Sequence, residues 1–151
     1  MPTPDQVLFM RQAIALARGQ VGRTGANPAV GCVIVQGGKV VGQAATADGG
    51  RPHAEEQALQ VAGDLARGAQ VFVTLEPCGE RTAGEPSCAL RLLRAAVSEV
   101  FIACADGAPF ASGRGCALLL GGGVAINRGL LEDEASTLYA DYRPQGSERR
   151  D

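Results

Sequence analysis

The sequence predicts a single α/β domain, a three-layer α/β/α sandwich around a mixed five-stranded sheet. Short segments rich in valine and isoleucine alternate with segments of helical periodicity along most of the chain. Strands that alternate with helices are typical of a mostly parallel sheet covered on both faces. A Gly-Gly pair between the first two strand-like segments indicates one antiparallel hairpin at the start of the sheet. A chain of 151 residues has the length of one domain.

The first three elements are predicted from their boundaries. Thr3-Pro4 resembles an N-cap followed by proline at the first helical position, and apolar residues then recur at helical spacing as far as Gly19. Residues 29–35 and 39–45 read as two strands, because both are rich in valine and Gly37-Gly38 separates them. We therefore expect a helix followed by a hairpin.

The rest of the chain alternates between helix and strand. We expect helices over residues 53–62, 87–96, 113–120 and 130–142. Between them we expect strands over residues 70–75, 99–105 and 124–127. Gly63 is expected to close the first of these helices and Ser87 to cap the second. Residues 144–151 are polar and expected to be disordered, which leaves 1–143 as the predicted domain.

The composition excludes several classes of protein. Hydrophobic residues make up 46% and charged residues 20%, as in globular proteins rather than disordered ones. No stretch approaches the ~20 apolar residues of a membrane span, and no basic segment precedes an apolar run at the N-terminus. We expect a cytoplasmic protein that does not enter a membrane.

The charge distribution argues against long nucleic acids as ligands. The formal net charge is −2, Lys39 is the only lysine, and the arginines are scattered apart from Arg149 and Arg150. Proteins that bind polynucleotides usually present a basic face to the phosphates. A small-molecule substrate, phosphorylated at one position, suits this balance better.

Two motifs and a third cysteine predict a metal site. Five cysteines, an odd number, favour reduced thiols or a metal over a disulfide framework, and His53 is the only histidine. His53 and Glu55 lie in a Pro-His-Ala-Glu motif at a predicted helix start, Cys78 follows Glu-Pro at the end of a strand, and Cys88 begins the next helix. One imidazole and two thiolates form a three-ligand zinc site with a fourth position open to water, and zinc brings the pKa of bound water near neutrality. His-x-Glu with Pro-Cys is the zinc deaminase signature, in which the glutamate moves protons and does not bind the metal.

Two alternatives to a catalytic site remain open. His53, Cys78 and Cys88 could be packing residues that meet by coincidence. The site could also be a closed structural zinc site with a fourth cysteine ligand. The candidates are Cys32, Cys104 and Cys116, which we otherwise expect to be core residues because they lie within predicted strands and a helix. Asn27, just before the first strand, either belongs to a turn or directs its amide at a substrate.

Three stretches of the sequence resemble the cytidine deaminase-like superfamily: residues 27–35 (Asn-Pro-Ala-Val-Gly-Cys-Val-Ile-Val), Pro52–Glu55, and residues 73–78 (Val-Thr-Leu-Glu-Pro-Cys). Within it the chain looks like the deaminases of riboflavin biosynthesis, which act on a diaminopyrimidine ribotide. The resemblance covers most of residues 22–140. Nine residues separate Cys78 from Cys88, like the long loop of this branch and unlike the Pro-Cys-x-x-Cys typical of tRNA deaminases.

The resemblance implies a role for each site residue. His53, Cys78 and Cys88 would bind Zn²⁺, and Glu55 would shuttle protons. The backbone N–H of Cys78 would face the metal-bound water, which makes it a catalytic group as well. Asn27 would contact the substrate. The exocyclic amine of the substrate would leave as ammonia.

The sequence also departs from the riboflavin-pathway pattern. The loop of residues 79–87 lacks the usual histidine, and Thr46 stands where another pocket histidine is common. Arg81 and Arg51 are candidates for contacting a substrate phosphate, or else solvated surface arginines. The usual reductase domain does not follow, so another protein would perform the reduction, or the enzyme would serve another pathway.

Two other functions stay open, and so does the oligomeric state. The first is a deaminase of a different small heterocycle, such as a free base, a nucleoside or a modified purine. The second is a non-catalytic, zinc-stabilised binding module. We also expect a homo-oligomer, with a dimer as the first candidate, because apolar helices such as residues 90–97 could form an interface.

Overall fold

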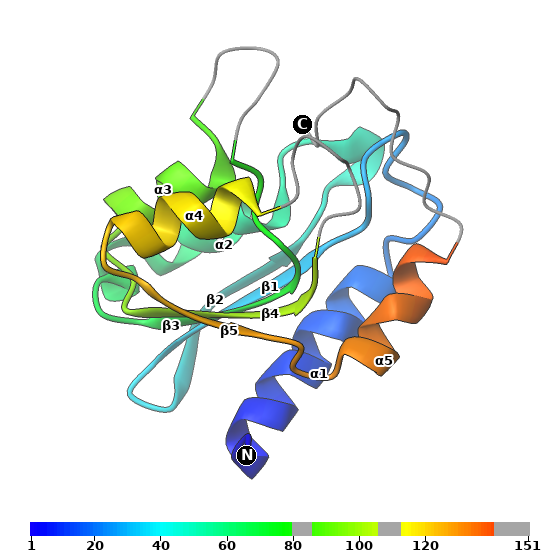
Figure 1. The fold of residues 1–151 in the computed structure, drawn as a ribbon. Helices are drawn as coiled ribbons and strands as arrows, with labels where there is room; N and C mark the ends of the chain where they lie inside the picture. Colours follow the sequence, from blue (N-terminus) through cyan, green and yellow to red (C-terminus); the bar gives the residue numbers. More distant parts are fainter. Residues whose placement is uncertain (80–85, 106–112, 141–151) are drawn as a thin grey trace.

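The computed structural model describes residues 1–79, 86–105 and 113–140 of the chain (Figure 1). A five-stranded sheet has the order β2-β1-β3-β4-β5. Its strands are β1 (Gly31–Gln36), β2 (Lys39–Ala45), β3 (Gln70–Leu75), β4 (Glu99–Cys104) and β5 (Ala125–Arg128). The α-helices are α1 (Pro4–Arg18), α2 (Ala54–Ala62), α3 (Cys88–Arg94), α4 (Arg114–Gly121) and α5 (Glu132–Ser136). The predicted order of elements is confirmed; the tail from 144 lies outside the described residues.

The sheet is half parallel. β3, β4 and β5 are parallel neighbours, whereas β1 is antiparallel to both β2 and β3. The mixed sheet was predicted, but its antiparallel part is not confined to the hairpin. The chain leaves β1 through β2 and α2 before it enters β3, and β3 then runs opposite to β1.

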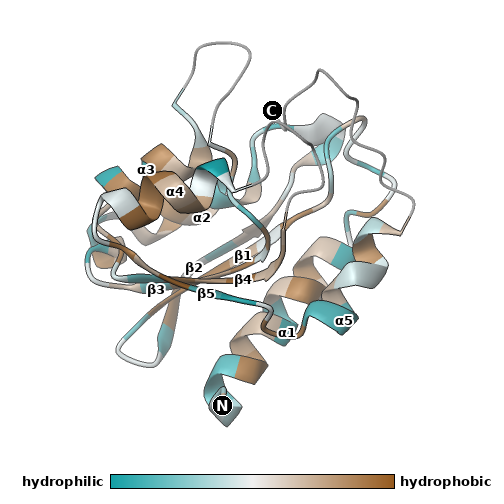
Figure 2. Cartoon of the chain, viewed as in Figure 1, coloured by the Kyte–Doolittle hydropathy of each residue, from teal (hydrophilic) through white to brown (hydrophobic). Residues whose placement is uncertain are grey.

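Helices cover both faces of the sheet, so the predicted three layers are confirmed. In Figure 1, α1 and α5 lie below the sheet and α2, α3 and α4 lie above it. The central strands β1, β3 and β4 are almost entirely buried. Apolar residues dominate α3, α4 and these strands in Figure 2. On the side of α1, the ring of Phe72 stacks on Phe101 with 4.6 Å between centroids and also meets Phe9.

Close packing places α2 over the hairpin. A Cβ atom at Gly42 of β2 would lie 2.3 Å from the carbonyl oxygen of Ala58 in α2. Only glycine allows the helix backbone to approach the strand this closely. This contact fixes α2, and with it the helix start that carries His53.

Several parts of the structure differ from the sequence prediction. The helix predicted over 87–96 ends at Arg94, and Ala96 has a left-handed φ of 60° that a helix does not allow. The closing helix, predicted over 130–142, begins only at Glu132 and gives way to a 3₁₀ turn over Thr137–Tyr139, while residues 141–142 lie outside the described residues. Leu131 has a φ of 56°, in the left-handed region, so it cannot belong to the helix. Two further 3₁₀ turns, Asp48–Gly50 and Gly63–Ala66, were not predicted, since segments this short leave no periodic pattern.

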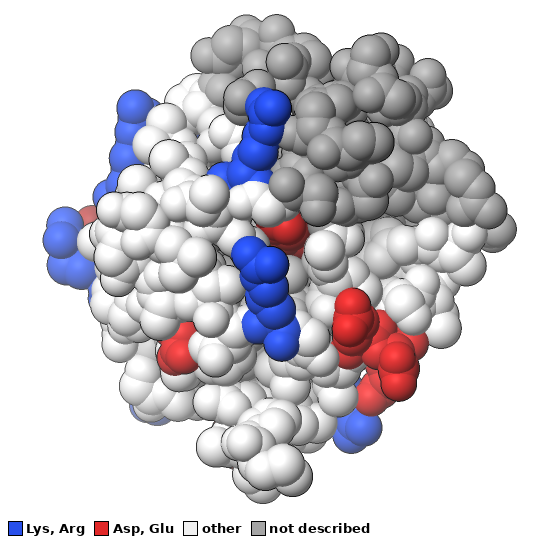
Figure 3. Space-filling view, in the orientation of Figure 1, with Lys and Arg blue, Asp and Glu red and all other residues white. Residues whose placement is uncertain are grey.

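On the face drawn in Figure 3, lysine and arginine side chains lie in separate groups, with uncharged and acidic surface between them. Among the described residues, no helix combines the length and apolar character needed to cross a bilayer.

Candidate metal centre

His53 is held at the start of α2. It is the N-cap residue, with extended backbone angles (φ −69°, ψ 160°), and its side chain is 1% exposed. The carboxylate of Glu56 accepts a hydrogen bond from the His53 backbone N–H at 3.3 Å. The N-cap position turns the chain into the helix, and here it leaves the imidazole inside the protein.

Cys78 and Cys88 meet where β3 ends and α3 begins. Cys78 follows β3 by three residues, and Cys88 is the first residue of α3, after the N-cap Ser87. The backbone N–H of Cys88 donates to Cys78 Sγ at 3.2 Å, and the N–H of Ala89 donates to the Cys78 carbonyl at 3.0 Å. Donors at a helix start favour a negatively charged sulfur, so this geometry suits a thiolate ligand.

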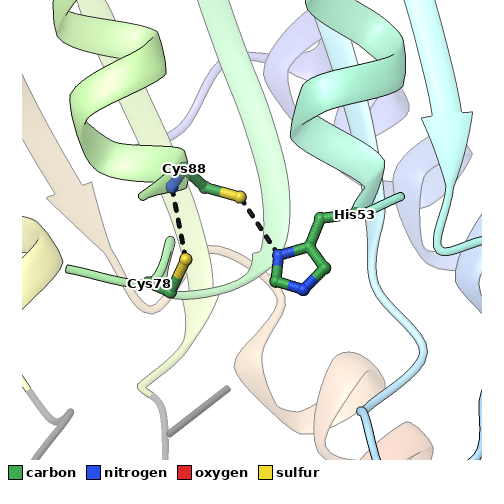
Figure 4. Close-up of side chains that lie close together, drawn as sticks. All are labelled: His53, Cys78 and Cys88. Carbon is green, nitrogen blue, oxygen red and sulfur yellow. Dashed lines mark hydrogen bonds between the residues drawn. The ribbon is translucent and has the colours of Figure 1, made fainter. Parts of the chain in front are cut away.

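The three side chains converge (Figure 4). Their ligand atoms all lie within 4.8 Å of one another, and His53 Nδ1 is 3.2 Å from Cys88 Sγ. Bonds of about 2.3 Å to sulfur and about 2.1 Å to nitrogen would place tetrahedral ligand atoms about 3.6–3.8 Å apart. His53 Nε2 is buried and has no hydrogen-bond partner among the described residues. The cluster therefore fits Zn²⁺, with Nδ1 as the nitrogen that faces the sulfurs.

The other cysteines do not join this cluster. Within the described residues, none of Cys32, Cys104 and Cys116 belongs to the group of possible ligands. Burial and the nearby Glu132 raise the pKa of Cys104 to about 11, and burial and Glu76 raise the pKa of Cys116. Thiols of this kind stay protonated at neutral pH. The described residues thus supply three ligands, as an open site requires, and not the four of a closed structural site.

Glu55 belongs to the same helix start as His53. It is in the first turn of α2, two residues after His53, and its side chain is completely buried. The structure thus brings a carboxylate to the same helix start as the predicted ligand. Its proton-transfer role remains a prediction.

Asn27 and Thr46 belong to two loops that are joined by hydrogen bonds. The Asn27 side-chain amide donates to the Gly50 carbonyl at 3.0 Å. Thr46 is 2% exposed, and its hydroxyl accepts from the Val30 N–H at 3.0 Å and donates to the Pro28 carbonyl at 3.3 Å. These bonds tie the Asn27 segment to the loop that leads into His53. Direct contact of either side chain with a substrate remains a prediction.

The two arginine candidates differ in what the structure describes. Arg51 is exposed and lies two residues before His53. Arg81 lies outside the described residues, in the segment 80–85. Phosphate binding by either arginine is untested.

Two residues that the sequence did not mark as functional, Glu76 and Gly115, join α4 to residues 76–78, the segment that carries Cys78 and is called the metal loop below. Glu76 is 1% exposed, and its carboxylate accepts a hydrogen bond from the Cys116 backbone N–H at 3.4 Å, at the start of α4. A Cβ atom at Gly115 would lie 1.8 Å from the Pro77 carbonyl oxygen, so α4 rests directly on the segment before Cys78. A carboxylate at the end of an apolar strand was the available signal for Glu76. Nothing in the sequence marks Gly115 as a contact.

Comparison with known proteins supports the same chemistry. Residues 4–104 match the family described as the cytidine and deoxycytidylate deaminase zinc-binding region. The riboflavin biosynthesis protein RibD of Aquifex aeolicus is 40% identical over 136 residues, which cover 89% of this chain and 37% of that protein. The chain thus spans a little over a third of the length of this relative.

Solved structures show the same fold. Acinetobacter baumannii RibD superimposes with a TM-score of 0.87 at 39% identity, over 91% of this chain and 38% of that one. A Thermotoga maritima protein described as a diaminohydroxyphosphoribosylaminopyrimidine deaminase and 5-amino-6-(5-phosphoribosylamino)uracil reductase superimposes with a TM-score of 0.82 at 35% identity. That match covers 89% of this chain and 39% of the other.

Proposed function

The chain belongs to the cytidine and deoxycytidylate deaminase zinc-binding family, and from that premise we propose that it hydrolyses the exocyclic amine of a diaminopyrimidine ribotide in riboflavin biosynthesis. The convergence of His53, Cys78 and Cys88 within 4.8 Å carries the proposal, together with the buried Glu55 two residues after His53. Among relatives, the similarity to RibD and to the Thermotoga maritima deaminase supports the choice of substrate.

Each residue of the centre has a distinct task in this proposal. His53, Cys78 and Cys88 would hold Zn²⁺, which when bound would lower the pKa of a coordinated water to near neutrality. Glu55 would carry one proton of the attacking water to the ring nitrogen and then the second proton to the leaving amine. The exocyclic C–N bond breaks, and the amine and water give a ring carbonyl and ammonia. Burial of the site excludes bulk water and strengthens these charge interactions.

The substrate contacts are proposed from the loops around the centre. Asn27 and Thr46 lie on joined loops beside the segment that leads to His53, and Asn27 is the candidate for contact with the substrate ring. Arg81 and Arg51 are the candidates for its phosphate, by charge-assisted hydrogen bonds. We place the protein in the cytoplasm as a homo-oligomer, with a dimer as the first candidate.

A deaminase of another small heterocycle is the second candidate. The Thr46 hydroxyl bonds to backbone groups of Pro28 and Val30, so it does not reproduce the pocket histidine that the riboflavin-pathway resemblance implies at this position. A pocket that lacks this imidazole could select a different base.

Ammonia release by the zinc-loaded protein distinguishes these candidates. The panel contains the diaminopyrimidine ribotide, cytosine, guanine, cytidine and adenosine, with a Cys88→Ser variant as the control for contaminating deaminases. Release from the ribotide alone supports the proposal. Release from another compound, and not from the ribotide, overturns the substrate and leaves the zinc chemistry in place.

A further inference from the structure

A charged pair connects the two helix starts that carry His53 and Cys88. Glu56 is the third residue of α2, and one of its carboxylate oxygens accepts the His53 backbone N–H at 3.3 Å. Its other oxygen lies 3.6 Å from a terminal nitrogen of Arg91 on α3. The two side chains are 17% and 33% exposed, so solvent screens this pair less than a surface ion pair.

Arg91 also contacts the segment that leads into Cys88. Its Nε donates to the Pro86 carbonyl at 3.3 Å, two residues before Cys88. A chain of contacts therefore runs from the His53 backbone through Glu56 and Arg91 to the residue before the Ser87 N-cap. It links two of the three predicted ligands without passing through the metal.

The space between the helices explains why this link matters. A groove of about 460 Å³ opens between α2 and α3, lined by Pro52, Glu56, Gln57, Pro86, Arg91 and Arg94 among others. Side-chain packing leaves this groove unfilled, and α2 and α3 have only nine and seven residues. Both helices direct their positive ends at the centre, and the Glu56 carboxylate in the first turn offsets that charge.

We propose that Glu56 and Arg91 are positioning residues that hold the two helix starts together, so that His53 and Cys88 can bind the same zinc ion. The inference rests on the proposed function only through the metal site, and it is independent of the substrate. Partners behind metal ligands typically change metal affinity by about 10–100-fold when they are removed. Because this pair acts through the backbone beside the ligands, we expect the lower end of that range.

Zinc affinity of the full chain, measured by competition with a chromogenic chelator, tests the pair. We expect Glu56→Gln and Arg91→Gln each to weaken Zn²⁺ binding about tenfold. The double variant should lose no more than either single variant, because both remove the same link. Arg94→Gln is the matched control, since Arg94 is on the same helix and lines the same groove. Arg91→Lys, which keeps the charge and loses the Nε donor, should fall between the wild type and Arg91→Gln.

A second readout separates positioning from general destabilisation. The visible absorption of the Co²⁺-substituted protein reports ligand geometry, and it should change in Glu56→Gln and Arg91→Gln and remain unchanged in Arg94→Gln. Zinc affinity within twofold of wild type in both single variants, or independent losses that add in the double variant, would overturn the inference. If Glu56→Gln and Arg91→Gln weaken zinc binding as expected but the protein releases no ammonia from the ribotide, only the proposed function is contradicted.

Discussion

Glu55 is the residue on which turnover should depend most directly. It is fully buried at the start of α2 and belongs to no predicted ligand set. We expect Glu55→Gln to lower kcat at least about 100-fold, the usual contribution of general acid–base catalysis. Zinc content by atomic absorption should stay at the wild-type value. Asp64→Asn, an exposed acid beyond the end of α2, is the control. Normal turnover in Glu55→Gln would refute the assigned role.

Cysteine reactivity provides a second test at the residue scale. Cys104, with a pKa raised to about 11, and the buried Cys116 should resist iodoacetamide at pH 7.5, because the thiolate is the reactive form. Cys78 and Cys88 should be protected while zinc is bound and modified once a chelator removes it. Peptide mass spectrometry identifies the sites. Modification of Cys104 ahead of Cys78 would contradict the assignment of ligand and core cysteines.

The sequence predicts ligands better than it predicts the contacts around them. His53, Cys78 and Cys88 could be identified because metal chemistry restricts residue type and spacing. The Thr46 hydroxyl bonds to backbone atoms of residues 28 and 30, which are distant in the chain. Only the fold brings those atoms together, so spacing alone could not show how the hydroxyl is used. The same holds for Glu56 and Arg91, which are far apart in sequence.

At the scale of elements, the start of α4 supports the metal loop. Gly115 lies against the Pro77 carbonyl, where a methyl group would overlap at 1.8 Å. We expect Gly115→Ala to destabilise the protein by about 1–3 kcal/mol, the usual cost of overpacking, and to weaken zinc binding through movement of Cys78. Urea unfolding and the chelator competition measure the two effects.

Gly121 provides the matched control in the same helix. A Cβ atom there would meet no atom within 4 Å, and its backbone is not left-handed. Gly121→Ala should leave zinc affinity unchanged and alter the free energy of unfolding by less than about 0.5 kcal/mol, because Gly121 is the exposed last residue of α4. Equal effects of the two substitutions would show that α4 does not support the loop.

The predicted boundaries of helices agree with the observed ones where a cap residue marks them. Thr3 caps α1 and accepts the Gln6 N–H, and Gly63 ends α2 with a φ of 56°. The length of the closing helix was overestimated, because tertiary contacts hold residues 137–139 in a 3₁₀ turn. The Tyr139 hydroxyl donates to the Ala29 carbonyl at 2.9 Å and lies 2.8 Å from Thr74 Oγ1. Contacts between residues so distant in sequence leave no local pattern.

At the scale of the whole molecule, the fold brings the three predicted zinc ligands together at one end of the sheet. β3 ends just before Cys78, and the starts of α2 and α3 arrive there from other parts of the chain. Ligands of α/β proteins commonly bind beyond the carboxyl ends of parallel strands. The three-layer class followed from the alternation of elements. The antiparallel pairing of β1 with β3 did not, because no local signal specifies which strands become neighbours.

The dependence of ammonia release on zinc tests the central claim most directly. Metal-free protein is titrated with Zn²⁺ in the presence of the diaminopyrimidine ribotide, and the initial rate is followed. We predict a rate that starts near zero, rises linearly and saturates at one zinc ion per chain. A His53→Ala variant should give no comparable rise. A rate that is independent of zinc, or equal saturation in His53→Ala, would contradict the account.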